Sequence, residues 1–471
     1  MNRLFSATMQ KRLKYPLLCG LLLQLALVAL AGCGGGEGEG EGDELRVMLD
    51  RNGGWGGTAE IAASLHDGPP VALEAPMRCG YRFLGYFSQR EGGRQYYGAD
   101  MHPLAPWWRG GKERPLYAHW EKETIVDPVA QGLFSTNMVF PGAEWETAAP
   151  ADEGINADVL PELERLVAGN GVLVRHGRIV FAWGQPDQRE DIHSACKPIY
   201  SMLLLVAVQK GLVAGVDAKV ADSFPELGKI NSGRDADITW RQLACMTSGY
   251  ATPDPPGTRW SYNDLGISLY AKTLATQVFG SEKMRTPFEQ EIFGPLGMQD
   301  EPFCVEEQTG TQHTGRIKIS ARDFARFGLL TMAGGRWAGR QLVREDLLVE
   351  MVTSQVPVTM HRSSYFSQKA WLVEGGESFG GSNNLDADGQ GIYSFNWWIN
   401  SGKPNGEQYL PGLPGYTYMA NGLEFQDACL VIPEWDVVMA WTGSHLSEWR
   451  HKERFIATLR ACLGLPFEPL E

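Results

Sequence analysis

A serine and a lysine three residues apart form the part of this sequence best suited to chemistry. Ser194 and Lys197 lie in the segment 193–198, which reads His-Ser-Ala-Cys-Lys-Pro and leads into an apolar run at 199–208. A helix over that run would bring both side chains to one face of its first turn. A serine hydroxyl becomes a nucleophile when a base removes its proton, and a buried lysine can be that base in its neutral form. The spacing therefore predicts Ser-Lys nucleophilic catalysis, and the free backbone N–H groups at the helix N-terminus could hold the developing oxyanion.

The same two residues also have a purely structural interpretation. Ser194 could cap the helix while Lys197 lies in solvent. A Ser-x-x-Lys spacing is expected about once or twice by chance in a chain of this length. The pair alone does not choose between the two interpretations.

The elements that would position this pair are a helix and a hairpin. Residues 155–168 carry apolar side chains at helical spacing, and residues 171–183 read as a strand, a His-Gly turn and a second strand. A helix, a hairpin and a further helix, followed by later strands, favour a mixed α/β (α+β) domain. In such a domain helices flank a central antiparallel sheet.

Four blocks of sequence, taken in order, resemble the serine β-lactamase-like family, which includes class C β-lactamases, penicillin-binding proteins and D-amino-acid peptidases, esterases and amide hydrolases. The blocks are residues 170–213, 238–249, 256–264 and 319–328. The resemblance implies a β-lactamase/transpeptidase-like hydrolase domain over residues 145–471.

Roles for three residues follow from this resemblance. It implies that Ser194 attacks an acyl carbon, that Lys197 takes its proton, and that Tyr262 of the Tyr-x-Asn motif shares the base role and protonates the leaving group. This chain has Asp264 where the motif has Asn. A carboxylate there accepts hydrogen bonds only, and it favours a charged Lys197, which is a weaker base.

The third motif of the family, Lys-Thr-Gly or His-x-Gly, has no clear match. The expected region, residues 416–425, contains neither lysine nor histidine. One register puts Gly422 at the motif glycine through Ala-Asn-Gly, and the rival register puts Phe425 there. Residues 441–443, Trp-Thr-Gly, are set aside because they end the next expected strand. Without the cation that would hold a substrate carboxylate, we expect a neutral ester or amide substrate.

Three functions follow from these observations. The favoured one is a serine hydrolase of esterase or amidase type acting on a small molecule. The alternatives are a β-lactamase or D-amino-acid peptidase acting on the cell wall, and a catalytically degenerate envelope binding protein. Trp371, Trp397 and Trp398 are candidates for a substrate rim, although core packing is the favoured interpretation. His193 is adjacent to Ser194 in sequence, but we expect it to point elsewhere and not to complete a triad.

The N-terminus predicts a lipoprotein. Residues 1–32 have a basic region followed by a short apolar stretch, as in a secretory signal peptide, and end in Leu-Ala-Gly before Cys33. This sequence resembles a bacterial lipobox, which implies lipidation of Cys33 and a membrane anchor. Residues 33–44 alternate glycine and glutamate and are expected to form a tether. We therefore expect a bacterial envelope protein that faces the periplasm or the exterior.

Residues 45–121 predict a separate small module. Short aromatic strands alternate with glycine-rich turns, and their order resembles one Listeria–Bacteroides (internalin B-type) repeat. The resemblance implies a β-grasp-like spacer that could contact another envelope component. Residues 122–144 are irregular and are expected to form a linker over the surface.

Composition excludes several classes of function. The chain has 471 residues and a net charge of −14, which argues against binding nucleic acid. It has no Cys-x-x-Cys, His-Glu-x-x-His or phosphate-binding glycine loop, so we expect no metal and no cofactor. Six scattered cysteines follow Cys33, and buried free thiols are favoured over disulfides for most of them.

Overall fold

The computed structural model describes residues 44–54, 56–64, 73–78, 81–104, 115–122, 125, 127–308, 313–368, 372, 383–446 and 451–466. All of them belong to one unit, Glu44–Glu471. The expected signal peptide (1–32), Cys33 and most of the tether lie outside the described residues, as do Cys79 and Trp371. Within the described ranges, no helix combines the length and the apolar character needed to cross a bilayer.

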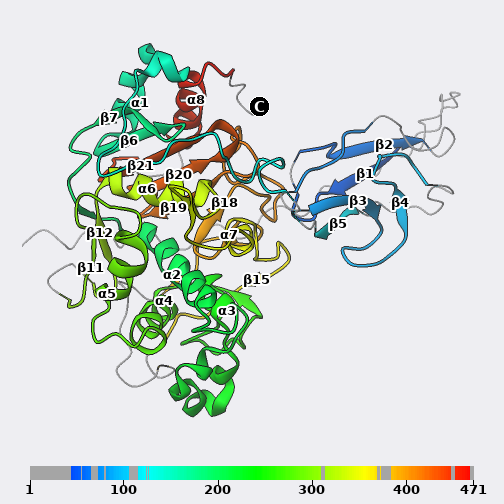
Figure 1. Cartoon of the computed structure of the whole chain (residues 1–471). Helices are drawn as coiled ribbons and strands as arrows, with labels where there is room; N and C mark the ends of the chain where they lie inside the picture. Colours follow the sequence, from blue (N-terminus) through cyan, green and yellow to red (C-terminus); the bar gives the residue numbers. More distant parts are fainter. Residues whose placement is uncertain are drawn as a thin grey trace, which may run out of the picture. The chain divides into compact units, whose positions relative to one another are not determined.

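A seven-stranded antiparallel sheet forms the centre of the C-terminal domain (Figure 1). Its strands, in spatial order, are β17 (Tyr393–Ser394), β18 (Trp397–Ile399), β19 (Tyr418–Gly422), β20 (Asp427–Ile432), β21 (Val437–Thr442), β6 (Asn170–Arg175) and β7 (Arg178–Trp183). The hairpin expected at residues 171–183 is therefore β6 and β7. It joins the sheet through the antiparallel pairing of β6 with β21.

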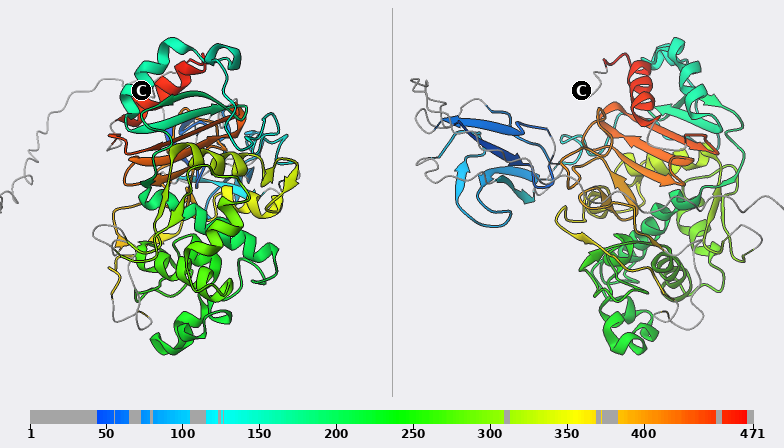
Figure 2. Two further views of the ribbon diagram at one scale, coloured as in Figure 1. Left: turned by 60° about the vertical axis from the view of Figure 1, so that its left-hand side comes forward. Right: turned by 180° about the vertical axis from the view of Figure 1, so that it is seen from behind.

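The central strands are apolar on both faces because both faces are covered. In β21, Val438 and Ala440 belong to one hydrophobic core, while Met439 and Trp441 belong to another. Successive side chains of a strand point to opposite faces, so a strand between two helical layers carries an unbroken apolar run. Figure 2 shows the same layers from two further sides.

Different helices cover the two faces of the sheet. Helices α1 (Leu160–Val167) and α8 (Lys452–Cys462) pack on each other and contribute to one core. Helix α6 (Ala321–Met332) packs on β20, β21 and β6 from the other side, and α2 (Lys197–Gln209) shares that second core. Helix α2 is apolar around most of its circumference, as expected of a helix surrounded by protein.

Shorter elements complete the domain. Its other helices are α3 (Trp240–Ala244), α4 (Asp264–Thr273), α5 (Arg285–Phe288) and α7 (Glu345–Val352), and its short strands are β8 (Glu190–Asp191), β9 (Arg259–Trp260), β10 (Tyr262–Asn263), β11 (Phe303–Cys304), β12 (Ile317–Ile319), β13 (Arg336–Trp337), β14 (Arg340–Gln341), β15 (His361–Arg362) and β16 (Asn383–Asn384). The five described cysteines are buried free thiols, as the sequence favoured.

The N-terminal module is a five-stranded sheet. Its strands, in spatial order, are β2 (Glu60–Ser64), β1 (Glu44–Asp50), β5 (Leu116–Lys122), β3 (Tyr81–Phe87) and β4 (Gln95–Tyr97). The pair β1 and β5 is parallel, and the other pairs are antiparallel. A small separate sheet is thus present as expected, whereas its assignment to a β-grasp-like Listeria–Bacteroides repeat stays a prediction.

Part of the expected linker does not run over the surface. The described residues 127–144 contain no helix or strand, but Leu133 and Phe134 are buried in the core that also holds α2 and α6. The Ser135 N–H donates to the Met332 carbonyl at the end of α6. An irregular sequence favours exposure, but burial of two large apolar side chains outweighs that tendency here.

Candidate active site

Ser194 and Lys197 meet where a 3₁₀ turn runs into a buried helix. The 3₁₀ helix η3 (His193–Cys196) carries Ser194, and α2 begins directly after it at Lys197. Lys197 Nζ donates to Ser194 Oγ at 2.7 Å. The Lys197 side chain is only 1% exposed, so the solvated lysine of the structural interpretation does not occur. A buried ammonium requires nearby acceptors, and Ser194 is one of them.

Tyr262 and Asp264 supply the other acceptors. Lys197 Nζ donates to Tyr262 Oη at 2.7 Å and forms an ion pair with Asp264 Oδ1 at 3.0 Å. Asn263, between them, is buried and caps α4 by accepting from the N–H groups of Leu265 and Gly266. Because Asn263 is held in this way, its two neighbours in sequence reach the site. The motif match left this capping role of Asn263 unassigned, although asparagine directly before an apolar helix is a standard N-cap signal.

The environment favours the charged form of Lys197. Burial by itself would lower the pKa of Lys197, but the negative charges available on Asp264 and Tyr262, and hydrogen bonds to both groups, outweigh burial and raise that pKa. The expectation that Asp264 would favour a charged lysine thus agrees with the geometry. An ammonium can donate to Ser194 but cannot accept its proton. The base must therefore arise when the cluster of Lys197, Tyr262 and Asp264 loses a proton.

Gly422 lies against the turn that carries Ser194. A Cβ built on Gly422 would overlap the Ile192 carbonyl oxygen and lie 2.9 Å from the Ala195 nitrogen. Gly422 is the last residue of β19, so the Ala-Asn-Gly register places a strand glycine beside the nucleophile. In the rival register, Phe425 lies in the following turn and its side chain belongs to the core on the α1 and α8 side. Gly422 therefore lies beside the Ser194 turn, and its assignment to the third motif stays a prediction.

Tyr262 is part of a row of three stacked aromatic side chains. The Trp398 ring is stacked on Tyr262, with centroids 6.3 Å apart, and on Tyr409, with centroids 5.5 Å apart. Trp398 is half-buried, whereas Trp397 is fully buried and stacks on Phe327. Of the two described candidates for a substrate rim, only Trp398 lies beside a site residue.

His193 has a partner that the sequence did not indicate. Its Nδ1 lies 2.7 Å from Oδ2 of Asp427, the first residue of β20, while Ser194 Oγ is bound by Lys197. His193 therefore points to Asp427 and does not form a Ser-His pair with Ser194. No local pattern could have found Asp427, because it lies 234 positions along the chain.

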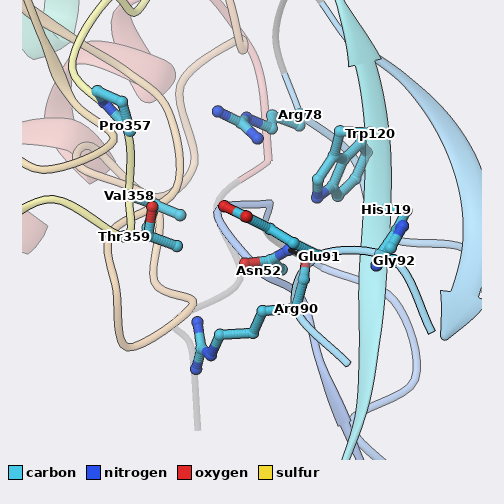
Figure 3. A pocket seen from close by; sticks show the side chains of 10 residues that line it. All are labelled: Asn52, Arg78, Arg90, Glu91, Gly92, His119, Trp120, Pro357, Val358 and Thr359. Carbon is cyan, nitrogen blue, oxygen red and sulfur yellow. Dashed lines mark hydrogen bonds between the residues drawn. The ribbon is translucent and has the colours of Figure 1, made fainter. Parts of the chain in front are cut away.

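A pocket that contains none of these site residues is lined by charged side chains. Figure 3 shows its lining, which includes Arg78, Arg90, Glu91 and His119 of the N-terminal module, together with residues 357–359. None of its lining residues is a serine, cysteine or lysine. Over the described ranges, no group of three or more histidine, cysteine or acidic side chains is arranged to hold a metal ion.

Comparison with known proteins supports the fold assignment. A family model described as Beta-lactamase matches residues 164–413. Similar solved structures include a β-lactamase from Mycobacterium bovis (17% identity, 64% of this chain and 98% of that chain, TM-score 0.46) and a family VIII carboxylesterase (14%, 68% and 99%, 0.48). A penicillin-binding protein homologue from Caulobacter crescentus is also similar (15%, 67% and 99%, 0.48). At these identities and scores the likenesses decide nothing about activity.

Comparison with curated proteins gives no match. The family match confirms the expectation of a β-lactamase-like domain within its residues. It does not reach the N-terminal module, so the repeat there is untested.

Proposed function

This chain belongs to the Beta-lactamase family, and on that premise we propose that it is a serine hydrolase that forms an acyl-enzyme on Ser194. The observation that carries the proposal is the position of Lys197 Nζ, 2.7 Å from both Ser194 Oγ and Tyr262 Oη. This arrangement gives the serine a direct route to a base and gives the leaving group a proton donor.

The reaction proceeds in two halves. Once the cluster around Lys197 has lost one proton to solvent, Ser194 Oγ attacks the substrate carbonyl carbon and its proton passes to Lys197 or Tyr262. The carbonyl oxygen becomes an oxyanion that backbone N–H groups stabilise, among them that of Ser194. Tyr262 protonates the departing alcohol or amine as the tetrahedral intermediate collapses. Water then attacks the acyl-enzyme, and the returning proton regenerates Ser194.

A neutral ester or amide is the substrate that fits the charges best. Asp264 lies within the site, and Glu424 is exposed on the turn after β19. The strand that carries a cation in related enzymes has Ala420 and Asn421 before Gly422. A substrate carboxylate would meet negative charge here, because no lysine or histidine occurs in residues 416–425.

The test compares wild-type protein with Ser194→Ala, both as full chains in detergent. A fluorophosphonate probe reports the nucleophile, p-nitrophenyl butyrate reports esterase activity, and nitrocefin reports β-lactamase activity. We expect labelling and ester hydrolysis that disappear in Ser194→Ala, with little turnover of nitrocefin. Preferred hydrolysis of nitrocefin would favour the β-lactamase alternative. No labelling of the wild type would favour a degenerate envelope binding protein.

We also propose that the protein is a lipid-anchored component of a bacterial envelope, with residues 45–121 as a spacer. The support is the lipobox-like sequence that ends at Cys33 and the acidic tether after it. Several acyl chains would anchor the protein firmly, because each buried CH₂ contributes about 0.8 kcal/mol. The intact mass of the native protein should correspond to a lipidated chain that begins at Cys33. A mature N-terminus elsewhere, without lipid, would contradict the anchor.

A further inference from the structure

A buried histidine–carboxylate pair ties the nucleophile turn to the sheet. Asp427 Oδ2 accepts a hydrogen bond from Nδ1 of His193, and its other oxygen accepts from the Gly443 N–H at 2.9 Å. The Asp427 side chain is 2% exposed and the His193 side chain is 28% exposed. A carboxylate this deeply buried needs donors for both oxygens, and these two groups supply them.

The pair joins the segment that carries Ser194 to the β19–β20 hairpin. His193 immediately precedes Ser194, and Asp427 is paired in register with Gly422 at the end of β19. Gly422 in turn lies against the Ile192 carbonyl and the Ala195 nitrogen. The hydrogen bond therefore connects η3, which bears the serine, to the β19–β20 hairpin that packs against it.

Both segments have backbone conformations that need support. His193 has φ +49°, and the three residues after Gly422, at 423–425, have φ values of 45°, 55° and 73°. None of the four is glycine, so the left-handed conformation is unfavourable at each. Such strain persists where the surroundings hold it, and it often marks a functional site. Asn421 holds the hairpin turn by accepting from the Phe425 N–H, and Asp427 holds the serine turn through His193.

We propose that His193 and Asp427 are a positioning pair that aligns the oxyanion donors of the Ser194 turn with the end of β19. This inference rests on the proposed serine hydrolase function. Neither side chain touches the reacting atoms. Oxyanion donors act only at about 2.7–3.1 Å from the developing charge, so a shift of one wall against the other weakens stabilisation of the transition state. Substrate binding before that step depends much less on this distance.

Three replacements of His193 separate this role from general stability. Asparagine carries its Nδ2 donor at the same distance from Cβ as the histidine Nδ1, and it tolerates a left-handed φ. His193→Asn therefore keeps the hydrogen bond. His193→Ala removes the donor, and His193→Gly removes it while relieving the backbone strain. His176→Ala is the matched control, because His176 has φ +48° and is paired with Glu153 and Asp436 at the β6–β7 turn.

The experiment measures kcat and KM for p-nitrophenyl butyrate and the rate of fluorophosphonate inactivation in the full chain. For His193→Ala and His193→Gly we expect kcat and the inactivation rate to fall at least about tenfold, with KM within about twofold. His193→Asn should restore most of the rate. His176→Ala should lower the melting temperature without lowering kcat.

Asp427→Asn, combined with His193→Ala, completes a double-mutant cycle for this contact. Because both residues act through one contact, the double variant His193→Ala/Asp427→Asn should be no slower than the slower single variant. The inference would be overturned by additive losses of kcat in the double variant. It would also be overturned if His193→Ala kept the wild-type kcat, or if His193→Asn lost as much kcat as His193→Ala. A wild-type protein that fails to react with the probe would instead contradict the serine hydrolase proposal, and this inference with it.

Discussion

Asp264 Oδ1 lies 3.0 Å from Lys197 Nζ, in a site where Lys197 also donates to Ser194 and Tyr262. This ion pair opposes the effect of burial and is the main reason that the pKa of Lys197 is raised. In the proposed reaction the cluster must first lose a proton, so the Asp264 carboxylate is expected to lower the rate at low pH. The pair thus links the charge of one side chain to the rate of the reaction.

Replacing Asp264 by asparagine should move the acidic limb of the pH–rate profile to lower pH. Loss of the negative charge lowers the pKa of Lys197, so the cluster deprotonates at lower pH and accepts the Ser194 proton there. The measurement is the rate of fluorophosphonate inactivation from pH 6 to 11. The control Glu226→Gln removes an equal charge outside the site. A limb that stays in place in Asp264→Asn would contradict the role assigned to this ion pair.

The same pair makes stability depend on pH. Folding raises the pKa of Lys197, so the stability it contributes is complete at neutral pH and is lost as pH rises through the folded pKa. Breaking a buried pair costs about 3–5 kcal/mol, and we expect roughly 1–3 kcal/mol here because Lys197 keeps two other acceptors. Urea denaturation should show this difference between wild type and Asp264→Asn at pH 7. The difference should narrow at alkaline pH, and a gap that widens there would contradict the assignment.

Replacing Tyr262 by phenylalanine should lower kcat by about 10²–10⁴-fold, the usual contribution of a general acid or base. Stability should change little, because the ring keeps its stacking on Trp398. Lys197 also keeps its contacts with Ser194 and Asp264. Steady-state kinetics and a thermal melt test both parts. A large fall in melting temperature would assign the lost activity to unfolding.

Replacing Gly422 by alanine should reduce kcat by about 10²–10³-fold, comparable to the loss of one oxyanion donor. The added Cβ would overlap the Ile192 carbonyl, so either η3 or the end of β19 must move. The strain should also cost about 1–3 kcal/mol of folding free energy. Gly215→Ala is the matched control, because Gly215 has open space around it and no positive φ. Equal activity of the two variants would exclude close packing of Gly422 as a requirement.

Burial of Lys452 should make the folded protein more stable as the pH rises. Burial lowers the pKa of Lys452 to about 8, with Lys403 adding repulsion. Between pH 8 and the ordinary pKa of lysine, the unfolded chain binds more protons at this residue than the folded chain does. The folded state therefore gains stability as the pH rises. Lys452→Met removes this gain, although it also removes the hydrogen bond to the Tyr409 carbonyl. We expect the melting temperature of wild type, measured from pH 7 to 10, to rise relative to that of Lys452→Met as the pH increases. A constant difference would contradict the buried charge.

The sequence alone determined those features of this protein that depend on short-range backbone geometry. Ser194 and Lys197 are one helical turn apart, so their contact follows from short-range backbone geometry once the apolar run at 199–208 becomes a helix. The β6–β7 hairpin follows in the same way from two short apolar runs with a His-Gly turn between them. Irregular segments carry no such periodicity, which is why the burial of Leu133 and Phe134 was missed.

Only the tertiary structure decided the contacts between distant segments. Tyr262 reaches Lys197 across 65 positions because Asn263 caps α4 beside it, and the choice of Gly422 over Phe425 depends on where β19 ends. The contact of His193 with Asp427 depends on the β19–β20 register and on the packing of η3 against those strands. Register and packing are set by the whole core, since a shift of one residue turns each side chain to the other face. No local pattern around either residue carries that information.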